Sequence, residues 1–358
     1  MSFDLEYCKK KFTDLSGNIV LSEISTSDDE MFSLTIRNLK GSKSEYDKIY
    51  YDDILPCYPI LRTYAYEHDE NRGDYFSIVA KKAQREKIIV VLIGIRYAEG
   101  PNRLNGCHND IKNIYNFLNK YYENNEHFEL DYLILADSDD PICGNITNLS
   151  PTRLNILNTL DVIKNNYEKF IVHYSGHGYF IPDYSNDETD GRDEIIVPYD
   201  YATEGIITDD QLNSHFLQKL DNNCSVKILM DCCNSGTLCD LKMYYNDTNI
   251  AINNSAPNVT ASVIKLSGCK DDQFSYEDYV DGKYQGAFTN CLLQSLEQNS
   301  KTDLLTLVND INSRLVSGGW GEQTSKLTSS YFIYNKDTFL GFEDISEGET
   351  LLSSSVQN

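Results

Sequence analysis

Apolar residues follow two alternating patterns along residues 87–335. Continuous β-branched and aliphatic runs such as 87–95 predict strands buried on both faces. Between them, apolar side chains recur at helical spacing, as at Ile111, Ile114 and Leu118. Further strands are predicted at 131–136, 169–176, 225–231, 262–268 and near 330–334. Further helices are predicted at 150–166, near 287–298 and near 302–316, and a loop with a helix is predicted within 205–220. Strands that alternate with helices predict an α/β fold: a mainly parallel central sheet between two helical layers.

Polar segments set the predicted boundaries of this domain. Residues 1–86 are polar and only weakly periodic, which predicts an N-terminal extension with a few short elements rather than a second core. We expect this extension to be a pro-segment that packs on the main domain, 87–344. Residues 345–358 have the composition of a flexible tail.

The charge balance excludes several classes of partner. The 358 residues contain 31 Lys and Arg against 55 Asp and Glu, a net charge of −24. Such a surface repels phosphate backbones and anionic lipids, so neither nucleic acid nor membrane is expected as a partner. The opening segment lacks an apolar stretch, no apolar run approaches the roughly 20 residues of a membrane helix, and the ten cysteines form no disulfide framework. These features predict a reduced, cytoplasmic protein.

Three segments with reactive side chains follow predicted strands directly: NGCHND (105–110), YSGHGY (174–179) and DCCNSG (231–236). The carboxyl ends of parallel strands share one edge of a sheet, where binding crevices form. The topology therefore brings together Cys107, Asp110, His177, Asp231 and the pair Cys232/Cys233.

A cysteine beside a histidine suits acyl transfer by a thiolate. The imidazole takes the thiol proton and later protonates the leaving amine. The Gly178 amide and the nucleophile's own amide can hold the oxyanion. Taken singly, each residue is better explained as a satisfied core histidine or a buried inert thiol, but their combination at neighbouring strand ends favours catalysis. Spacing alone does not decide between Cys232 and Cys233.

The motifs GCHND, YSGHG, DGRDEIIVPYD (190–200), ITDDQL (207–212) and DCCNSGTLCDL (231–241) carry a family resemblance. Residues 87–335 resemble the catalytic domain of a metacaspase, a monomeric caspase-fold cysteine peptidase that cleaves after Arg or Lys. The resemblance implies a caspase-like three-layer sandwich, with His177 as catalytic base, Cys233 as nucleophile and Cys232 as a buried neighbour. The sequence departs from the family at Asn234, where a histidine is usual.

Two acidic residues at the strand ends predict the substrate. Asp110 and Asp231 would repel each other unless a cation lay between them, and a guanidinium or ammonium group satisfies both. The resemblance assigns Cys107, Asp110, Ser175 and Asp231 to the S1 pocket. The alternative is that both aspartates cap helices or turns. The opposite, acidic specificity is disfavoured because Arg103 would pair with these carboxylates.

A second group of acidic residues is a candidate calcium site. The resemblance places Ca²⁺ on Asp193, Asp209, Asp210 and Asp240, and carboxylate oxygens are the ligands that calcium prefers. The alternative is a solvated acidic face. An EF-hand is excluded because Val197 stands where its bidentate glutamate belongs, and zinc because the Cys and His residues lack the spacing of a zinc site. Since Asp240 follows Cys233 by only seven residues, we expect calcium to switch activity on.

The sequence thus predicts a calcium-dependent cysteine endopeptidase acting on protein or peptide substrates with Arg or Lys at P1. Self-cleavage is expected after Lys or Arg in 241–260 or near Lys81-Lys82, with Lys265 and Lys270 as poorer targets. One alternative is a caspase-fold scaffold or calcium-binding interaction protein with little catalytic activity. Another is a caspase-like peptidase that needs no metal.

Overall fold

The chain divides into two compact units, residues 1–86 and 87–358. The computed structural model describes residue 10 and residues 18–26, 29–37, 42–54, 61–69, 73–81, 85–125, 127–183, 191–245, 249–334 and 336–342. The predicted tail, 345–358, lies outside these residues, as does Lys82. None of the helices in these ranges has the length and apolar character needed to cross a bilayer.

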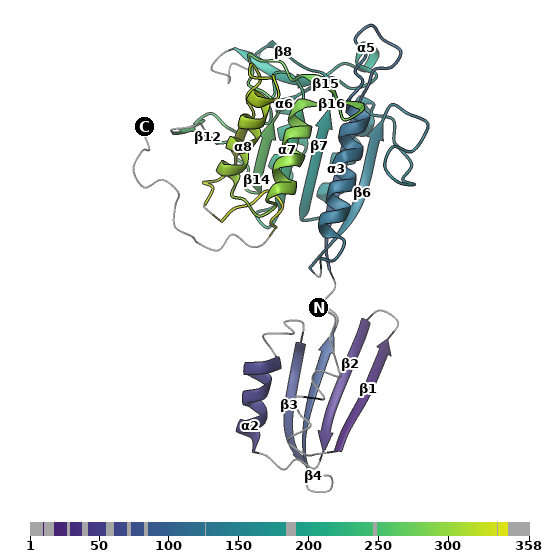
Figure 1. Ribbon diagram of the computed structural model, residues 1–358, viewed down its shortest axis with the longest axis vertical. Coiled ribbons are helices and arrows are strands. Elements are labelled where there is room, and N and C mark those ends of the chain that lie inside the picture. The colour runs from purple at the N-terminus through teal and green to yellow at the C-terminus, as the bar shows by residue number, and fades with distance from the viewer. Residues whose placement is uncertain are drawn as a thin grey trace. The chain divides into compact units, whose positions relative to one another are not determined.

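The N-terminal unit contains an antiparallel sheet of order β1-β2-β4-β3, with the helix α2 (Lys43–Ile49) beside it (Figure 1). Its strands are β1 (Asn18–Thr26), β2 (Asp29–Arg37), β3 (Leu61–Asp69) and β4 (Gly73–Lys81). Each strand has nine residues, so the expectation of a few short elements was wrong.

The second unit is built on an eight-stranded sheet of order β13-β12-β17-β14-β11-β7-β5-β6. Its strands are β5 (Glu86–Gly94), β6 (Phe128–Ala136), β7 (Lys169–Ser175), β11 (Ser225–Asp231), β12 (Met243–Tyr245), β13 (Ile250–Ile252), β14 (Ser262–Ser267) and β17 (Lys326–Ser329). β5, β7, β11 and β14 run parallel to one another, and the short strands β17, β12 and β13 pair antiparallel beyond β14. The predicted mainly parallel α/β architecture is confirmed.

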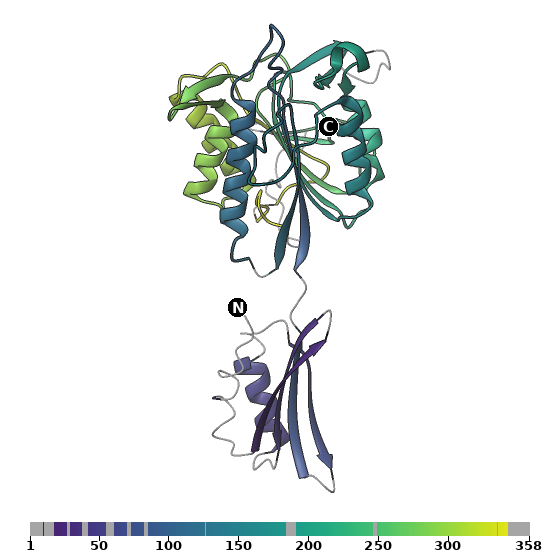
Figure 2. The same ribbon diagram turned by 90° about the vertical axis from the view of Figure 1, so that its right-hand side faces the viewer.

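Helices cover both faces of this sheet, as the edge-on view shows (Figure 2). On one face α3 (Cys107–Tyr122), α7 (Ala287–Gln298) and α8 (Leu304–Ser317) pack on one apolar cluster, which includes Ile111, Phe288 and Ile311. On the other, α4 (Arg153–Lys164) and α6 (Asp209–His215) pack on a second cluster around Phe170. Each cluster uses alternate side chains of the central strands, because successive residues of a strand point to opposite faces. These are the three layers that the hydrophobic pattern predicted.

Several short elements lie at the carboxyl edge of the sheet. They are β8 (Gly178–Pro182), β9 (Arg192–Ile196), β10 (Ile207–Thr208), α5 (Tyr201–Glu204), β15 (Glu277–Val280) and β16 (Lys283–Gly286). The 3₁₀ turn Leu217–Lys219 instead follows α6 and precedes β11. The region 241–260 was predicted as a polar loop, but β12 and β13 form a hairpin there that extends the sheet. Thr152, rather than Ser150, caps α4 through its side chain, which accepts the Asn155 amide.

Candidate active site

The register of the parallel strands places the predicted reactive segments at the same edge of the sheet. Ser175, the last residue of β7, lies opposite both Gly94 of β5 and Asp231 of β11. The segments Gly176-His177 and Cys232-Cys233 therefore leave the same edge of the sheet from neighbouring strands. This convergence is the one expected from parallel topology.

The two cysteines in the turn after β11 differ in solvent exposure. Cys232 is buried at 1% exposure, whereas Cys233 is partly exposed. Asn234 has a φ of 51°, in the left-handed region that Asn tolerates better than most residues. Its side-chain amide donates to the Asp271 carbonyl. Asn234, where the family usually has His, thus serves to hold the cysteine turn against the 268–275 loop.

The 268–275 loop is a part of the site that sequence reasoning missed. The Ser275 amide donates to Sγ of Cys233 at 3.4 Å, and the Cys269 thiol donates to the Cys232 carbonyl at 3.3 Å. The Asp271 carboxylate accepts the Thr237 amide at 2.8 Å. Burial raises the pKa of the Cys233 thiol, while the Ser275 amide acts in the opposite direction. The resting sulfur is therefore a neutral thiol that needs a base to ionise.

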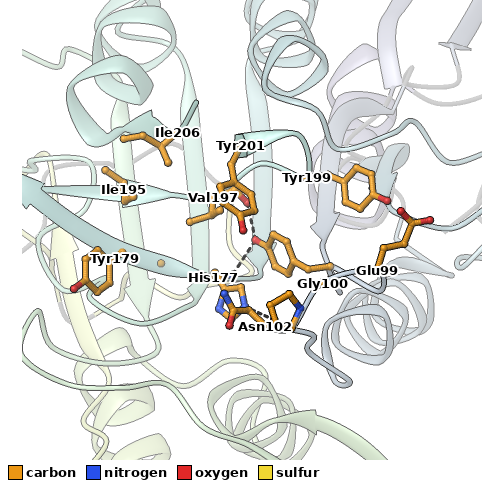
Figure 3. A pocket seen from close by; sticks show the side chains of 13 residues that line it. Glu99, Gly100, Asn102, His177, Tyr179, Ile195, Val197, Tyr199, Tyr201 and Ile206 are labelled. Carbon is orange, nitrogen blue, oxygen red and sulfur yellow. Dashed lines mark hydrogen bonds between the residues drawn. The ribbon is translucent and has the colours of Figure 1, made fainter. Parts of the chain in front are cut away.

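A backbone carbonyl orients His177. Its Nε2 lies 2.6 Å from the Asn102 oxygen (Figure 3). A carbonyl can only accept, so Nε2 carries a proton and Nδ1 is left as the acceptor of the ring. The Tyr97 ring lies 4.6 Å from the imidazole, and the Tyr97 hydroxyl accepts the His177 amide at 3.1 Å. These contacts fix the tautomer that a general base requires.

Gly178 brings the two reactive segments into contact. A Cβ at Gly178 would overlap the Cys233 carbonyl oxygen and lie 3.1 Å from Sγ of Cys232. Only glycine permits this close backbone approach. Among the described residues there is no hydrogen bond between the His177 and Cys233 side chains, whose partners are Asn102 and Ser275. Catalytic contacts are often long in free enzymes, so the lack of this hydrogen bond does not exclude a Cys–His pair.

The four predicted S1 residues lie together in a buried group. Asp110 is 1% exposed and accepts the Ser175 hydroxyl and the Gly286 amide, both at 2.8 Å. Asp231 accepts the Ser275 hydroxyl at 2.6 Å and the Thr289 hydroxyl at 2.7 Å. Burial, and then the charge of Asp231, raise the pKa of Asp110 well above its ordinary value. The pKa of the neighbouring Cys107 thiol is raised by burial and then by Asp110.

Gly286 separates the two carboxylates, and sequence reasoning missed it. A Cβ there would overlap one Asp231 oxygen and lie 3.1 Å from Asp110 Oδ2. A third carboxylate, Glu277, accepts the amides of Asn105 and Gly106 at 2.8 and 2.7 Å. It lies close enough to raise the pKa of Asp110 and Asp231 as a lesser cause. Three carboxyl groups so close together, two of them buried, favour a cationic partner over a neutral or anionic one.

The four aspartates predicted for calcium occupy three neighbouring segments. Asp209 and Asp240 both raise the pKa of the Cys239 thiol, after burial, so they share one neighbourhood. Asp209 accepts the Glu194 amide at 3.2 Å, next to Asp193, and the Asp210 amide at 2.9 Å. Hard carboxylate oxygens suit calcium chemically. Within the described ranges, however, no three His, Cys, Asp or Glu side chains are arranged as a metal-binding group.

The sequence of this domain is similar to those of known peptidases. The profile of the family "Metacaspase, peptidase C14 domain" matches residues 89–242. Metacaspase-1 of Meyerozyma guilliermondii is 28% identical over 276 residues, covering 63% of this chain and 65% of the relative. Metacaspase-1B of Aspergillus oryzae is 30% identical, covering 63% and 64%. Residues 89–242 thus resemble a metacaspase domain. The chain thus spans slightly less than two thirds of the length of these two relatives.

The metacaspase match includes His177, Cys233 and the four aspartates, but it ends before Ser275 and Gly286. Two solved structures also align with this chain. One is the protein GSU0716 from Geobacter sulfurreducens, at 23% identity and a TM-score of 0.47, covering 68% of this chain and 93% of that one. The other is described as pro-sf-caspase-1, at 10% identity and a TM-score of 0.40, covering 69% and 88%. Both scores lie below 0.5, so the likeness to metacaspases rests on the sequence comparisons.

Proposed function

We propose that this chain is a cysteine endopeptidase that cleaves peptides after Arg or Lys. The observation that carries the proposal is the close approach of the Gly178 backbone, directly after His177, to the Cys233 carbonyl. The Asn102 carbonyl at Nε2 of His177 supports it, because Nδ1 then remains an acceptor. The preference for a basic P1 residue is supported by Asp110 and Asp231, buried on either side of Gly286. A guanidinium or ammonium group between them would relieve their repulsion.

The proposed reaction uses the residues of the chain alone. Nδ1 of His177 takes the thiol proton as sulfur attacks the scissile carbonyl, forming a C–S bond and an oxyanion. The amides of Gly178 and Cys233 are the proposed donors to that oxyanion. The C–N bond then breaks, and the amine leaves with the proton from His177. Water, deprotonated by the same imidazole, hydrolyses the thioester and restores the thiol.

We expect a fluorogenic peptide with Arg or Lys at P1 to be turned over, and the same peptide with Asp at P1 to be inert. Cys233→Ala should abolish turnover, because the acyl acceptor is lost, whereas Cys291→Ala should retain it, because that buried thiol lies in α7. Initial rates at equal substrate concentrations provide the measurement. Equal, low rates for the wild type and Cys233→Ala would favour the scaffold alternative instead.

Calcium dependence is part of the proposal. Bound at the four aspartates, calcium would supply positive charge to offset their mutual repulsion. The hydrogen bond between Thr237 and Glu194, 2.6 Å long, supports a link from this region to the loop that follows Cys233.

Activity is expected to rise with free calcium and to fall to background in chelator, and Asp240→Asn should shift the midpoint of the titration to higher calcium. Calcium binding followed by calorimetry on Cys233→Ala gives a second readout that does not depend on catalysis. Full activity in chelator would exclude the switch and leave a metal-free peptidase. Intact mass after the same incubation reports self-cleavage, with Cys233→Ala as the uncut control.

The position of any self-cleavage is narrowed by burial. Lys265 has no exposed surface, so the bond that follows it is protected. Lys242 is exposed and is the single basic residue in 241–260, which makes it the proposed site in that region. The monomeric state and the cytoplasmic location remain predictions from the sequence.

A further inference from the structure

A cavity lies beside His177, the proposed catalytic base. It has a volume of about 620 Å³, within the range of small-ligand sites, and His177, Gly178 and Asn102 contribute to its wall. The rest of its lining is mainly apolar and aromatic (Figure 3). It comes from the segment between β5 and α3, the segment from β8 to α5, and the segment between α5 and β10. Those side chains include Tyr179, Ile195, Val197, Tyr199, Tyr201 and Ile206.

The chemistry of the dyad fixes which part of a substrate enters this cavity. The acyl half of the substrate becomes bonded to Cys233, and its P1 side chain enters the pocket of Asp110 and Asp231. The amine half leaves with a proton from His177, so it must lie on the imidazole side. The cavity has His177 in its wall, and its lining includes neither Cys233 nor either S1 carboxylate. It is therefore placed for the residues that follow the scissile bond.

The lining indicates which side chain fits. Tyr179 and Tyr201 expose 58% and 43% of their surface, which leaves aromatic area available for contact. The Tyr97 hydroxyl is already engaged, donating to the Val197 carbonyl at 2.6 Å, so it requires no ligand partner. Glu99 is the acidic member of the lining and lies near the Tyr199 hydroxyl in Figure 3. An apolar guest gains burial here, and an acidic guest is repelled.

We infer that this cavity is the subsite for the side chain directly after the scissile bond, and that it selects a large apolar or aromatic residue there. The inference rests on the proposed peptidase function and adds the P1′ position to its substrate class. It assigns a role to Tyr179, Tyr199, Tyr201 and Ile206 as specificity-determining residues.

The test is a set of internally quenched peptides with Arg fixed at P1 and only P1′ varied among Phe, Leu, Gly and Asp. We expect kcat/KM for Phe and Leu to exceed that for Gly by about 10- to 30-fold, as partial burial of such side chains allows, with Asp lowest. Ile206→Trp fills the cavity from a position outside the dyad and should bring the Phe-to-Gly ratio to about one. Val162→Trp, at a residue 57% exposed on α4, is the control that keeps the wild-type ratio.

The rates of the wild-type enzyme on the P1′ peptides test the subsite even if a variant fails to fold. Equal rates for Phe, Leu and Gly, or a preference for Gly, would overturn the subsite and leave the peptidase function standing. Cleavage of none of the peptides would remove the proposed function, and the subsite with it. An unchanged Phe-to-Gly ratio in folded Ile206→Trp would also refute the assignment, because the preference would then arise elsewhere.

Discussion

Replacing Asp110 by Asn is expected to lower kcat/KM for peptides with Arg or Lys at P1 by about 100-fold or more, while raising the midpoint of thermal unfolding. Loss of one partner of a buried charge pair has effects of this size. The asparagine can keep both local contacts, because its carbonyl accepts the Gly286 amide and its amino group donates to the Ser175 oxygen. What it loses is the charge that would bind the substrate.

The gain in stability follows from the direction of the pKa shift. The folded state raises the pKa of Asp110 above 3.8, so it binds the proton more tightly than the unfolded chain does. The stability contributed by this proton is greatest at low pH and is lost as pH rises through the raised pKa. The Asn variant escapes that loss, so its advantage should be larger at about pH 8 than at about pH 4.

Asp139→Asn is the matched control, since that carboxylate is exposed on the surface. It should change neither the P1 preference nor the slope of stability against pH. Kinetics with Arg and Lys substrates and thermal scans across pH give both readouts. An Asp110→Asn variant that cleaves after Arg at the wild-type rate, or that unfolds earlier than wild type at neutral pH, would contradict the role given to Asp110.

Replacing Lys265 by Met is expected to cost about 3 kcal/mol of unfolding free energy and to reduce kcat strongly. The Lys265 side chain, on β14, is completely buried, and its ammonium group donates to the Ser235 and Gly236 carbonyls at 2.8 and 2.9 Å and also to the Leu238 carbonyl. These carbonyls belong to the loop directly after the nucleophile. Methionine fills similar space but leaves several buried acceptors unsatisfied.

Lys227→Met provides the comparison. Lys227 lies on the adjacent strand β11, is 4% exposed, and has its ammonium 5.5 Å from the Phe342 ring. Burial lowers the pKa of Lys227 to about 8, so keeping it charged at neutral pH already costs stability. Replacing Lys227 by Met should therefore leave the free energy of unfolding unchanged or raise it below about pH 8. Urea unfolding and kcat for both variants test the contrast, and equal losses for the two would refute a specific role for Lys265.

The layers of the second unit were predictable because burial on both faces leaves a strong signal. The strand at 225–231 and the helix at 287–298 begin and end at the predicted residues. The last strand was predicted near 330–334 but lies at Lys326–Ser329, because its apolar side chains continue past the paired segment. The two-residue strand β10 was missed because so short an element makes too few contacts to shape a sequence pattern.

Some residues of the candidate site were predictable from the sequence, and others were not. Asp110, His177, Asp231 and Cys233 were predicted to meet because each follows a strand whose carboxyl end has a fixed place in a parallel sheet. The contribution of Asn102 was not predictable, since it acts through a carbonyl that every residue possesses. Ser275 reaches the site from the loop after β14 and Gly286 from the end of β16. A contact between Ser275 and Cys233, 42 residues apart, has no local signature in the sequence.

The strand pairing described above also determines what a broken chain would look like. β11 and β12 precede the short connection between Tyr245 and Ile250, whereas their partners β13, β14 and β17 follow it. Cleavage of one peptide bond in that connection would give two fragments whose strands still pair in one sheet. Cys233 would lie on the first fragment and Ser275 on the second. Such a two-piece molecule should migrate as intact protein in a native gel and separate only under denaturing conditions.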